Sequence, residues 1–351
     1  MNSKSHVRIS SKPTVNDLAR HAGVSLATVD RVLNARPGVR RVTIERVNKA
    51  VDEIGYIRDT AAANLARRRV YRFEFLLPDI RSEFVDALQF QIDAQSAALS
   101  TDRIFLHTNR VKAFDSQSIV LALDATEPES VNGVALIAPE TPAVRDAIGR
   151  ARDRGVVVVA LLSDLPSSSR DHFVGIDNNS AGQTAARLMG RFIKGDAGSI
   201  LMLTNSRLAR DHLERRHGFD RVMSSCYPEL KVLPTVELRD DTASAEKVLP
   251  EVLRNCPDLK GIYTSDSSNG SLIDFLCKTV AKPVVIAHDL TPISRKALEQ
   301  GVFDALISQD SGHIVRSAVH IMRATLDTVP YNEMLEQIKI EIFLKENLPS
   351  A

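Results

Sequence analysis

The spacing of apolar residues divides the chain into two parts. Near the N-terminus, Val15, Leu18 and Ala22 recur at helical spacing and predict a helix from about Val15 to Ala22. From Tyr71 onwards, short apolar runs alternate with amphipathic segments. The runs that suit buried parallel strands are residues 73–77, 102–107, 133–138, 156–162, 173–176, 199–203, 261–263, 284–287 and 305–307, and the segments that suit helices are residues 84–99, 143–154, 181–193, 210–226, 243–256 and 293–300. This alternation predicts an α/β body with two doubly wound parallel-sheet lobes.

Capping residues and a glycine frame the first helix. Thr14 and Asp17 form an S/T-x-x-D start that satisfies free N–H groups of a first turn, and Gly23 suits the left-handed backbone of a tight turn between helices. Ser25 can cap a second helix whose Val29 faces inward. Two short helices joined by a tight turn predict a helix-turn-helix, although small amphipathic helix pairs also occur in proteins of other functions.

The second helix presents an outer face that suits the major groove of DNA. Its outward side chains are Leu26, Ala27, Asp30, Arg31 and Asn34. Arg31 is the best candidate for reading a base, because a guanidinium can form two hydrogen bonds with guanine. Residues 1–72 contain 15 Lys and Arg against 6 Asp and Glu, whereas the rest of the chain contains 30 against 38. A basic segment on an acidic body favours a nucleic-acid-binding module fused to another domain.

The N-terminal residues resemble a known family. The run TVNDLARHAGVSLATVDRVLN, followed by VRRVTIERVNKAVDEIGYIRDTAAANLARRR, is similar to the DNA-binding headpiece of the LacI family of bacterial transcription regulators. The resemblance implies a third helix from roughly Val42 to Ile54 and base contacts by Leu26, Ala27 and Arg31. The residues that it implies hold phosphates or position the fold are Thr14, Asn16, Ser25, Thr28, Asn34, Thr43 and Tyr56.

Asp30 departs from the family pattern, in which serine is usual. Phosphates repel an acidic side chain, so Asp30 can instead accept a hydrogen bond from a cytosine amino group or pair with a neighbouring arginine. A solvated position on the helix surface is the other interpretation.

Residues 58–69, RDTAAANLARRR, have little apolar surface, so a helix there is marginal in isolation. The resemblance implies a hinge helix that pairs with its mate from a second subunit in the DNA minor groove, with Ala62 and Leu65 at the contacts. An apolar side chain can unstack a base step there while the arginines lie near phosphates. A flexible basic linker is the alternative.

Polar residues follow the predicted strands of the body. Ligands of such sheets bind beyond the carboxyl ends of the strands, and two facing lobes form a cleft. Carboxylates, amides and an arginine that converge there can bind the hydroxyls of a sugar or polyol. The body also resembles the sugar-binding-protein-like effector domain of the LacI family, so the resemblance covers nearly the whole chain. The expected effector-binding residues are Asp79, Phe84, Ser163, Asp164, Arg215, Ser265, Asp266, Asp289 and Gln309.

Three of these residues match ligand positions of the family: Arg215 in ERRHGF, Asp289 in HDLT and Gln309 in SQD. A structural salt bridge is the alternative role of Arg215. Ser265 replaces the asparagine that is usual before Asp266, and Ser163 stands where an aspartate is frequent, which weakens the prediction of a particular sugar.

Three further residues have open roles. Phe84 can stack on the apolar face of a pyranose or pack in the core at a helix start. Asp177 and Asn178 can line the pocket, but a helix N-cap before Ala181 suits their position better.

Length and composition limit the classes of protein to which this chain can belong. With 351 residues and 44% hydrophobic content, the chain can form two or three domains. The longest apolar run, residues 156–162, is too short to cross a membrane, and no signal segment is evident, so a cytoplasmic, nucleoid-associated protein without a membrane partner is expected. The three cysteines are scattered and lack metal-site spacing, so neither a metal nor another cofactor is expected.

These patterns predict a headpiece at residues 1–57, a hinge helix or linker at 58–70 and a bilobal effector-binding and dimerisation domain at 71–349. The predicted function is a ligand-responsive regulator, a repressor of a carbohydrate uptake or catabolism operon that binds a palindromic operator as a homodimer. Dimers are expected rather than tetramers because no heptad tail follows the body. The alternative is an α/β enzyme acting on a small polar substrate with an accessory DNA-binding domain, which the missing GxSxG, P-loop and GxGxxG motifs disfavour.

Overall fold

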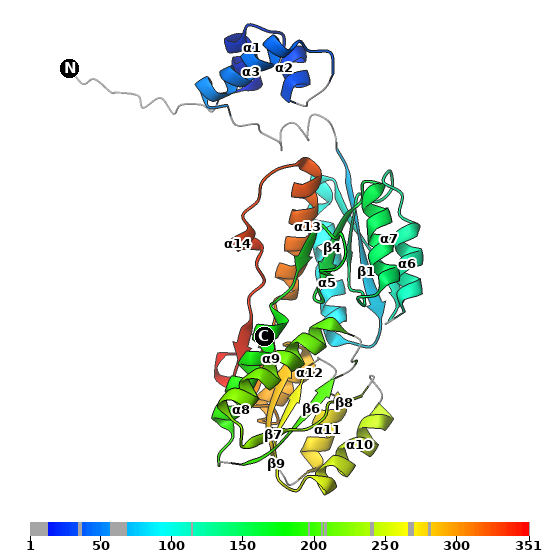
Figure 1. The fold of residues 1–351 in the computed structure, drawn as a ribbon, viewed down its shortest axis with the longest axis vertical. Helices are drawn as coiled ribbons and strands as arrows, with labels where there is room; N and C mark the ends of the chain where they lie inside the picture. Colours follow the sequence, from blue (N-terminus) through cyan, green and yellow to red (C-terminus); the bar gives the residue numbers. More distant parts are fainter. Residues whose placement is uncertain are drawn as a thin grey trace, which may run out of the picture. The chain divides into compact units, whose positions relative to one another are not determined.

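A computed structural model describes residues 13–33, 37–56, 69–113, 115–195, 197–204, 206, 209–238, 242–265, 270–279 and 282–350. The chain separates into two compact units, Met1–Arg69 and Val70–Ala351 (Figure 1). The first unit contains the headpiece helices, and the second contains the α/β body.

The described part of the headpiece contains three helices: α1 (Val15–Ala22), α2 (Leu26–Leu33) and α3 (Arg41–Ile54). A capping box starts α1, in which the Thr14 amide donates to Asp17 Oδ2 at 2.9 Å. Gly23 ends α1 in the left-handed conformation with φ of 62°, and Ser25 Oγ accepts from the Thr28 amide at 3.2 Å. The predicted helices and their turn are therefore confirmed. Their shared core consists of Leu18, Ala19, Ala22, Val29, Val47, Ala50 and Tyr56.

The first lobe of the body is built on a five-stranded parallel sheet in the order β2-β1-β3-β4-β5. Its strands are β1 (Tyr71–Asp79), β2 (Ile104–Lys112), β3 (Gly133–Leu136), β4 (Val157–Leu161) and β5 (His172–Val174). Helices α5 (Glu83–Leu99) and α13 (Ser311–Asp327) pack on one face, and α6 (Ser116–Asp124) and α7 (Pro142–Asp153) on the other (Figure 1).

The second lobe has the strand order β12-β11-β10-β9-β6-β7, with β8 beside β6. Its strands are β6 (Gly198–Thr204), β7 (Leu230–Val232), β8 (Val236–Glu237), β9 (Leu259–Thr264), β10 (Val284–His288), β11 (Ala305–Ser308) and β12 (Glu341–Phe343). Helices α8 (Asn178–Phe192) and α9 (Arg210–Cys226) cover one face, and α10 (Thr242–Asn255), α11 (Gly270–Lys278) and α12 (Pro292–Glu299) cover the other. Strand β12 is antiparallel to β11, while the other pairs are parallel.

Three segments cross between the lobes in the part of the body that the structure describes. The chain passes from β5 to α8, from β11 back to α13, and finally through residues 328–340, which include α14 (Glu333–Glu336), to β12. One hydrophobic cluster contains residues of both lobes. The predicted fold class, a small helical domain joined to two doubly wound lobes, is confirmed.

Two glycines let α8 and α9 touch through their backbones. A Cβ atom at Gly182 would lie 1.9 Å from the Arg215 carbonyl oxygen, and one at Gly218 would lie 2.0 Å from the Asn179 carbonyl oxygen. Such distances are far inside van der Waals contact, so only glycine fits at either position. The close crossing places the start of α8 against the middle of α9.

No helix in the described part of the chain is long and apolar enough to span a membrane. The three cysteines, Cys226, Cys256 and Cys277, are free thiols. Among the residues that the structure describes, no group of three or more His, Cys, Asp or Glu could hold a metal ion.

Candidate DNA interface and ligand site

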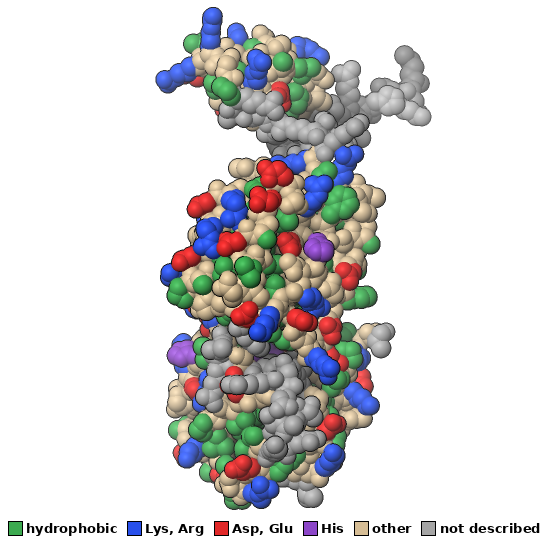
Figure 2. Space-filling model, turned by 90° about the vertical axis from the view of Figure 1, so that its right-hand side faces the viewer, with side chains coloured by type: hydrophobic (Ala, Val, Ile, Leu, Met, Phe, Trp, Pro, Cys, Tyr) green, Lys and Arg blue, Asp and Glu red, His purple; other side chains and the backbone are tan. Residues whose placement is uncertain are grey.

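The outer side of α2 carries the three residues expected to contact bases. Leu26 is 49% exposed, Ala27 and Arg31 are also exposed, and Val29 is fully buried. The buried valine fixes the rotation of α2 about its axis, so the outward direction of the other three side chains follows from core packing. Lys and Arg side chains project from the headpiece on the face drawn in Figure 2.

A surface hollow at the turn between α1 and α2 gathers other expected DNA contacts. It is lined by Asn16, Ala19, Arg20, Gly23, Val24, Ser25 and Leu26. Ser25 Oγ also lies 2.9 Å from Thr28 Oγ1, so both hydroxyls stay at the first turn of α2. Amides at such a helix start favour an anion, which suits a phosphate position.

The other headpiece residues expected to contact phosphates or to position the fold differ in their burial and in their place on the helices. Thr43 is half-buried in the first turn of α3, and Thr14 caps α1. Tyr56 is buried in the headpiece core, which fits positioning of the fold. Asp30 is half-buried on α2. Asn34, Ala62 and Leu65 lie outside the described residues.

Arg215 of α9 is 2% exposed at the boundary between the lobes. Its Nε donates to Asn178 Oδ1 at 2.9 Å, and its Nη1 donates to the carbonyl oxygen of Ser265 at 2.6 Å. Asn178, the first residue of α8, donates from Nδ2 to the Leu162 carbonyl oxygen at 3.0 Å. Leu162 follows β4 in the first lobe, so these bonds connect both lobes. They fix a guanidinium where strands β4 and β9 end.

Two neighbouring strands of the second lobe end in buried polar residues. Asp289 follows β10 and Gln309 follows β11, and each is 4% exposed. The Asp289 amide donates to the Ile307 carbonyl oxygen at 2.8 Å, and Asp289 has a φ of 63°. Gln309 Oε1 is buried and accepts no hydrogen bond from the described part of the chain. A buried acceptor of this kind requires a donor, which a ligand can supply.

His288, which directly precedes Asp289, is another polar residue that follows a predicted strand, and it is fully buried. Its Nε2 is 2.8 Å from the Tyr263 hydroxyl, and the Tyr263 ring stacks on Phe219 of α9 with centroids 4.7 Å apart. Burial, and then electrostatic interactions with Arg215 and His212, hold the pKa of His288 well below its usual value. The imidazole is therefore neutral near pH 7. The sequence placed this histidine at a strand end, but its contact with Tyr263 and the cover by Phe219 depend on the packing of the strands and of α9.

Several other expected effector residues have partners within the protein. Ser163 Oγ accepts from the Asp211 amide at 3.3 Å. Asp164 pairs with Arg170, whose Nη2 donates to Asp164 Oδ2 at 2.7 Å. Ser265 Oγ donates to the Leu203 carbonyl oxygen at 3.3 Å. Ser163 and Ser265 therefore form hydrogen bonds with backbone groups, and Asp164 forms an ion pair.

Phe84, Asp79 and Asp266 are the other expected effector-binding residues, and Asp177 is the predicted helix cap. Phe84 is 7% exposed and packs in the hydrophobic core at the start of α5. Asp79 is exposed at the end of β1, and Asp266 lies outside the described residues. Asp177 caps α8, accepting from the Ser180 amide at 3.1 Å, as its position before Ala181 favoured.

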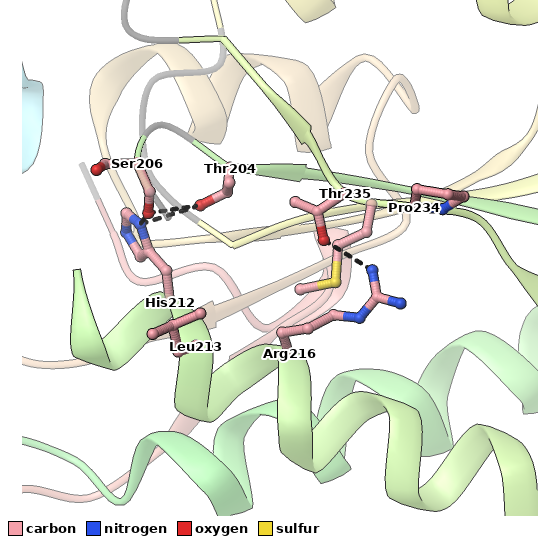
Figure 3. Close-up of a pocket in the computed structure, with 8 residues that line it drawn as sticks. Thr204, Ser206, His212, Leu213, Arg216, Pro234 and Thr235 are labelled. Carbon is pink, nitrogen blue, oxygen red and sulfur yellow. Dashed lines mark hydrogen bonds between the residues drawn. The ribbon is translucent and has the colours of Figure 1, made fainter. Parts of the chain in front are cut away.

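A separate hollow of about 210 Å³ lies on the second lobe (Figure 3), and its lining consists of Met202, Thr204, Ser206, His212, Leu213, Arg216, Pro234 and Thr235. Arg216 Nη1 donates to Thr235 Oγ1 at 2.7 Å, and His212 Nδ1 lies 2.9 Å from the Ser206 carbonyl oxygen. The consecutive residues Arg215 and Arg216 therefore lie in different regions. Arg215 lies at the boundary between the lobes, and Arg216 lines this hollow.

The fold and these two regions define a class of protein, in which a helix-turn-helix headpiece is joined to a body like that of the periplasmic binding proteins. The model of the periplasmic binding protein domain matches residues 73–328, and the model of the bacterial regulatory proteins of the lacI family matches residues 14–59. The chain belongs to the LacI family of bacterial regulatory proteins. This confirms the resemblance found in the sequence.

Individual relatives agree with this assignment. The chain is 26% identical over 292 residues to the HTH-type transcriptional regulator GntR of Pseudomonas aeruginosa, an alignment that covers 80% of each protein. It is 41% identical over 75 residues to the maltose regulon regulatory protein MalI of Vibrio furnissii, covering 21% of this chain and 55% of that one. The relatives are thus transcription regulators.

Solved structures share the fold of the body. A solute-binding protein of an ABC transporter from Burkholderia graminis, in complex with D-arabinose, superposes with a TM-score of 0.71 at 23% identity, covering 80% of this chain and 97% of that one. A putative LacI transcriptional regulator from Bacteroides fragilis superposes with a TM-score of 0.69 at 19% identity, covering 80% of this chain and 98% of that one. At sequence identities this low, the structural similarity shows only that the fold is shared.

Proposed function

We propose that this LacI-family protein represses a carbohydrate uptake or catabolism operon, binding a palindromic operator as a homodimer under the control of a sugar or polyol. The observation that carries the DNA-binding part is the exposed set of Leu26, Ala27 and Arg31 on a helix whose rotation is fixed by buried Val29. In this proposal residues 1–57 bind the major groove, residues 58–70 form the hinge, and residues 71–349 bind effector and partner subunit.

The effector in this proposal lies between the lobes. Arg215 supplies guanidinium donors, while Asp289 and Gln309 supply buried acceptors at adjacent strand ends. Such a mixture suits hydroxyl groups, each of which both donates and accepts. Two relatives support this ligand class, since MalI is named for a maltose regulon and the B. graminis protein holds D-arabinose. Differential affinity of the effector for two lobe arrangements would then change the affinity for DNA.

A homodimer is supported by exposed aromatic residues on the first lobe. Phe90 on α5 is 68% exposed and Phe105 on β2 is 46% exposed, and β2 is the outer strand of its sheet. Large apolar side chains at an open sheet edge favour contact with another protein surface. Two subunits would place two α2 helices in successive major-groove segments on one side of the duplex. Analytical ultracentrifugation of the full chain tests this arrangement.

Arg31→Ala should reduce specific operator affinity by about 1–3 kcal/mol and relax base preference at one position per half-site, because the guanidinium can bond a guanine edge. The measurement is fluorescence anisotropy with the operator and with each of its single-base variants. Arg46→Ala is the control, since Arg46 is exposed on α3 and should affect salt-sensitive binding without changing base preference. Unchanged base preference in Arg31→Ala would remove this residue from base readout.

The ligand proposal is tested by thermal unfolding of the full chain with sugars, sugar alcohols, sugar phosphates and nucleobases. A specific ligand at a hundred times its dissociation constant should stabilise the protein by about 2.7 kcal/mol and raise the midpoint. A ligand found in this way should change operator affinity and be recovered unaltered. Stabilisation by nucleobases alone would contradict a carbohydrate effector.

A further inference from the structure

Besides the bond from Asn178 to the Leu162 carbonyl oxygen, direct contacts join the two lobes at the starts of α9 and α12. At the start of α9, Arg210 forms an ion pair with Glu140, which follows β3 in the first lobe. The next amide, that of Asp211, donates to Ser163 Oγ of the first lobe at 3.3 Å. At the start of α12, the Ile293 amide donates to Glu83 Oε2 of α5 at 3.2 Å. Both helices belong to the second lobe, and all of these acceptors belong to the first.

These amides lie in first turns, where a helix has no acceptors of its own. The N-cap residue of α9 is Ala209, which makes no side-chain cap, and the Leu213 amide donates to the Ala209 carbonyl oxygen. In α12, Thr291 Oγ1 accepts from the Ser294 amide and leaves that of Ile293 to Glu83. Side chains of the first lobe therefore complete the capping of two helices in the second.

Charge reinforces this arrangement. Burial favours the neutral form of Glu140, but hydrogen bonds from Ser167 and Arg210 outweigh it, so the pKa of Glu140 lies below its usual value and the carboxylate is ionised. A carboxylate such as that of Glu83 is favoured at a helix N-terminus by the helix dipole. Arg210 also pairs with Glu214 of its own helix at 2.8 Å, which holds the guanidinium in place.

We propose that the contacts Glu140–Arg210, Ser163–Asp211 and Glu83–Ile293 form an interlobe latch that holds the lobes together in the absence of effector. The effect of this latch on the effector and on DNA rests on the proposed function, whereas the latch itself is a property of the ligand-free body. If the effector binds the arrangement in which these interlobe contacts are made, its apparent dissociation constant equals its intrinsic dissociation constant divided by the fraction of molecules in that arrangement. The latch then sets effector sensitivity through contacts between the two lobes.

Hydrogen exchange of the ligand-free full chain, followed by NMR, tests the latch at individual amides. The Asp211 and Ile293 amides should be protected in the wild type, because their acceptors belong to the other lobe. Ser163→Ala should speed exchange at Asp211, and Glu83→Ala should speed exchange at Ile293. Glu140→Ala should speed both by about two- to fivefold, the range expected for loss of a partly exposed ion pair that favours one arrangement.

The matched control is Glu299→Ala, which removes the Arg295–Glu299 pair of 3.0 Å within α12 and should leave both amides protected. Amides of β6 serve as the internal reference for global unfolding and should not change in any variant. Unprotected Asp211 and Ile293 amides in the wild type would overturn the latch, as would a Glu140→Ala effect confined to Asp211. A protein that shows the latch but ignores operator DNA would refute the proposed function alone.

Discussion

Gly218→Ala should lower the free energy of unfolding of the body by about 3 kcal/mol or more, the upper range for overpacking a core. The added Cβ would lie 2.0 Å from the Asn179 carbonyl oxygen, which is backbone and cannot rotate away. The two helices would have to separate, and this would also draw Asn178 away from Arg215. Urea denaturation followed by circular dichroism measures the change.

Gly149→Ala is the matched control for this prediction. Gly149 lies inside α7, and the nearest atom to an added Cβ is Ser169 Oγ at 3.7 Å, an ordinary contact. Alanine should stabilise the helix there by about 0.5–1 kcal/mol, because glycine loses more backbone entropy on folding. Similar destabilisation by both substitutions would show that the α8–α9 contact is not the cause.

Arg215→Met should lower the free energy of unfolding by about 2–4 kcal/mol and abolish the response to effector. Methionine retains apolar length but removes the donors, so Asn178 Oδ1 and the Ser265 carbonyl oxygen lose their partner in a buried place. Each unsatisfied buried group costs about 1–3 kcal/mol. Urea denaturation gives the stability change, and the thermal shift with the identified ligand gives the loss of binding.

Arg216→Met separates the ligand role from the general effect of losing an arginine in α9. Arg216 pairs with Asp220 at 2.6 Å and donates to Thr235, and its side chain is 24% exposed. A partly exposed pair of this kind contributes about 1 kcal/mol or less, and effector affinity should be unchanged. If Arg215→Met kept a normal ligand response, Arg215 would be a structural residue only.

Much of the headpiece could be predicted because its signals are local. Thr14 and Asp17 are three residues apart, Gly23 directly follows α1, and Ser25 directly precedes α2. Each acts on the backbone of its own turn, so the position of each helix end is encoded within a few residues. The buried position of Val29 follows from the same short-range periodicity.

Other elements of the body were not evident from the sequence. Helix α13 buries Ile314, Ser317, Val319 and Ile321, which do not form a single stripe, because it packs against both α5 and strands of the sheet. Strands β7, β8 and β12 are two or three residues long and form through pairing with β6 and β11. Short strands at sheet edges have too few residues for a clear pattern.

Local sequence therefore specifies where helices and strands form, that the chain carries a helix-turn-helix, and that Arg215, Asp289 and Gln309 follow the family pattern. Packing between distant segments sets what those side chains can do. Ser163 meets an amide 48 residues away, and Asn178 meets Arg215 because Gly182 and Gly218 let two helices touch. The reason is physical: capping and periodicity act within one turn, whereas hydrogen bonds across a lobe boundary depend on the final position of both lobes.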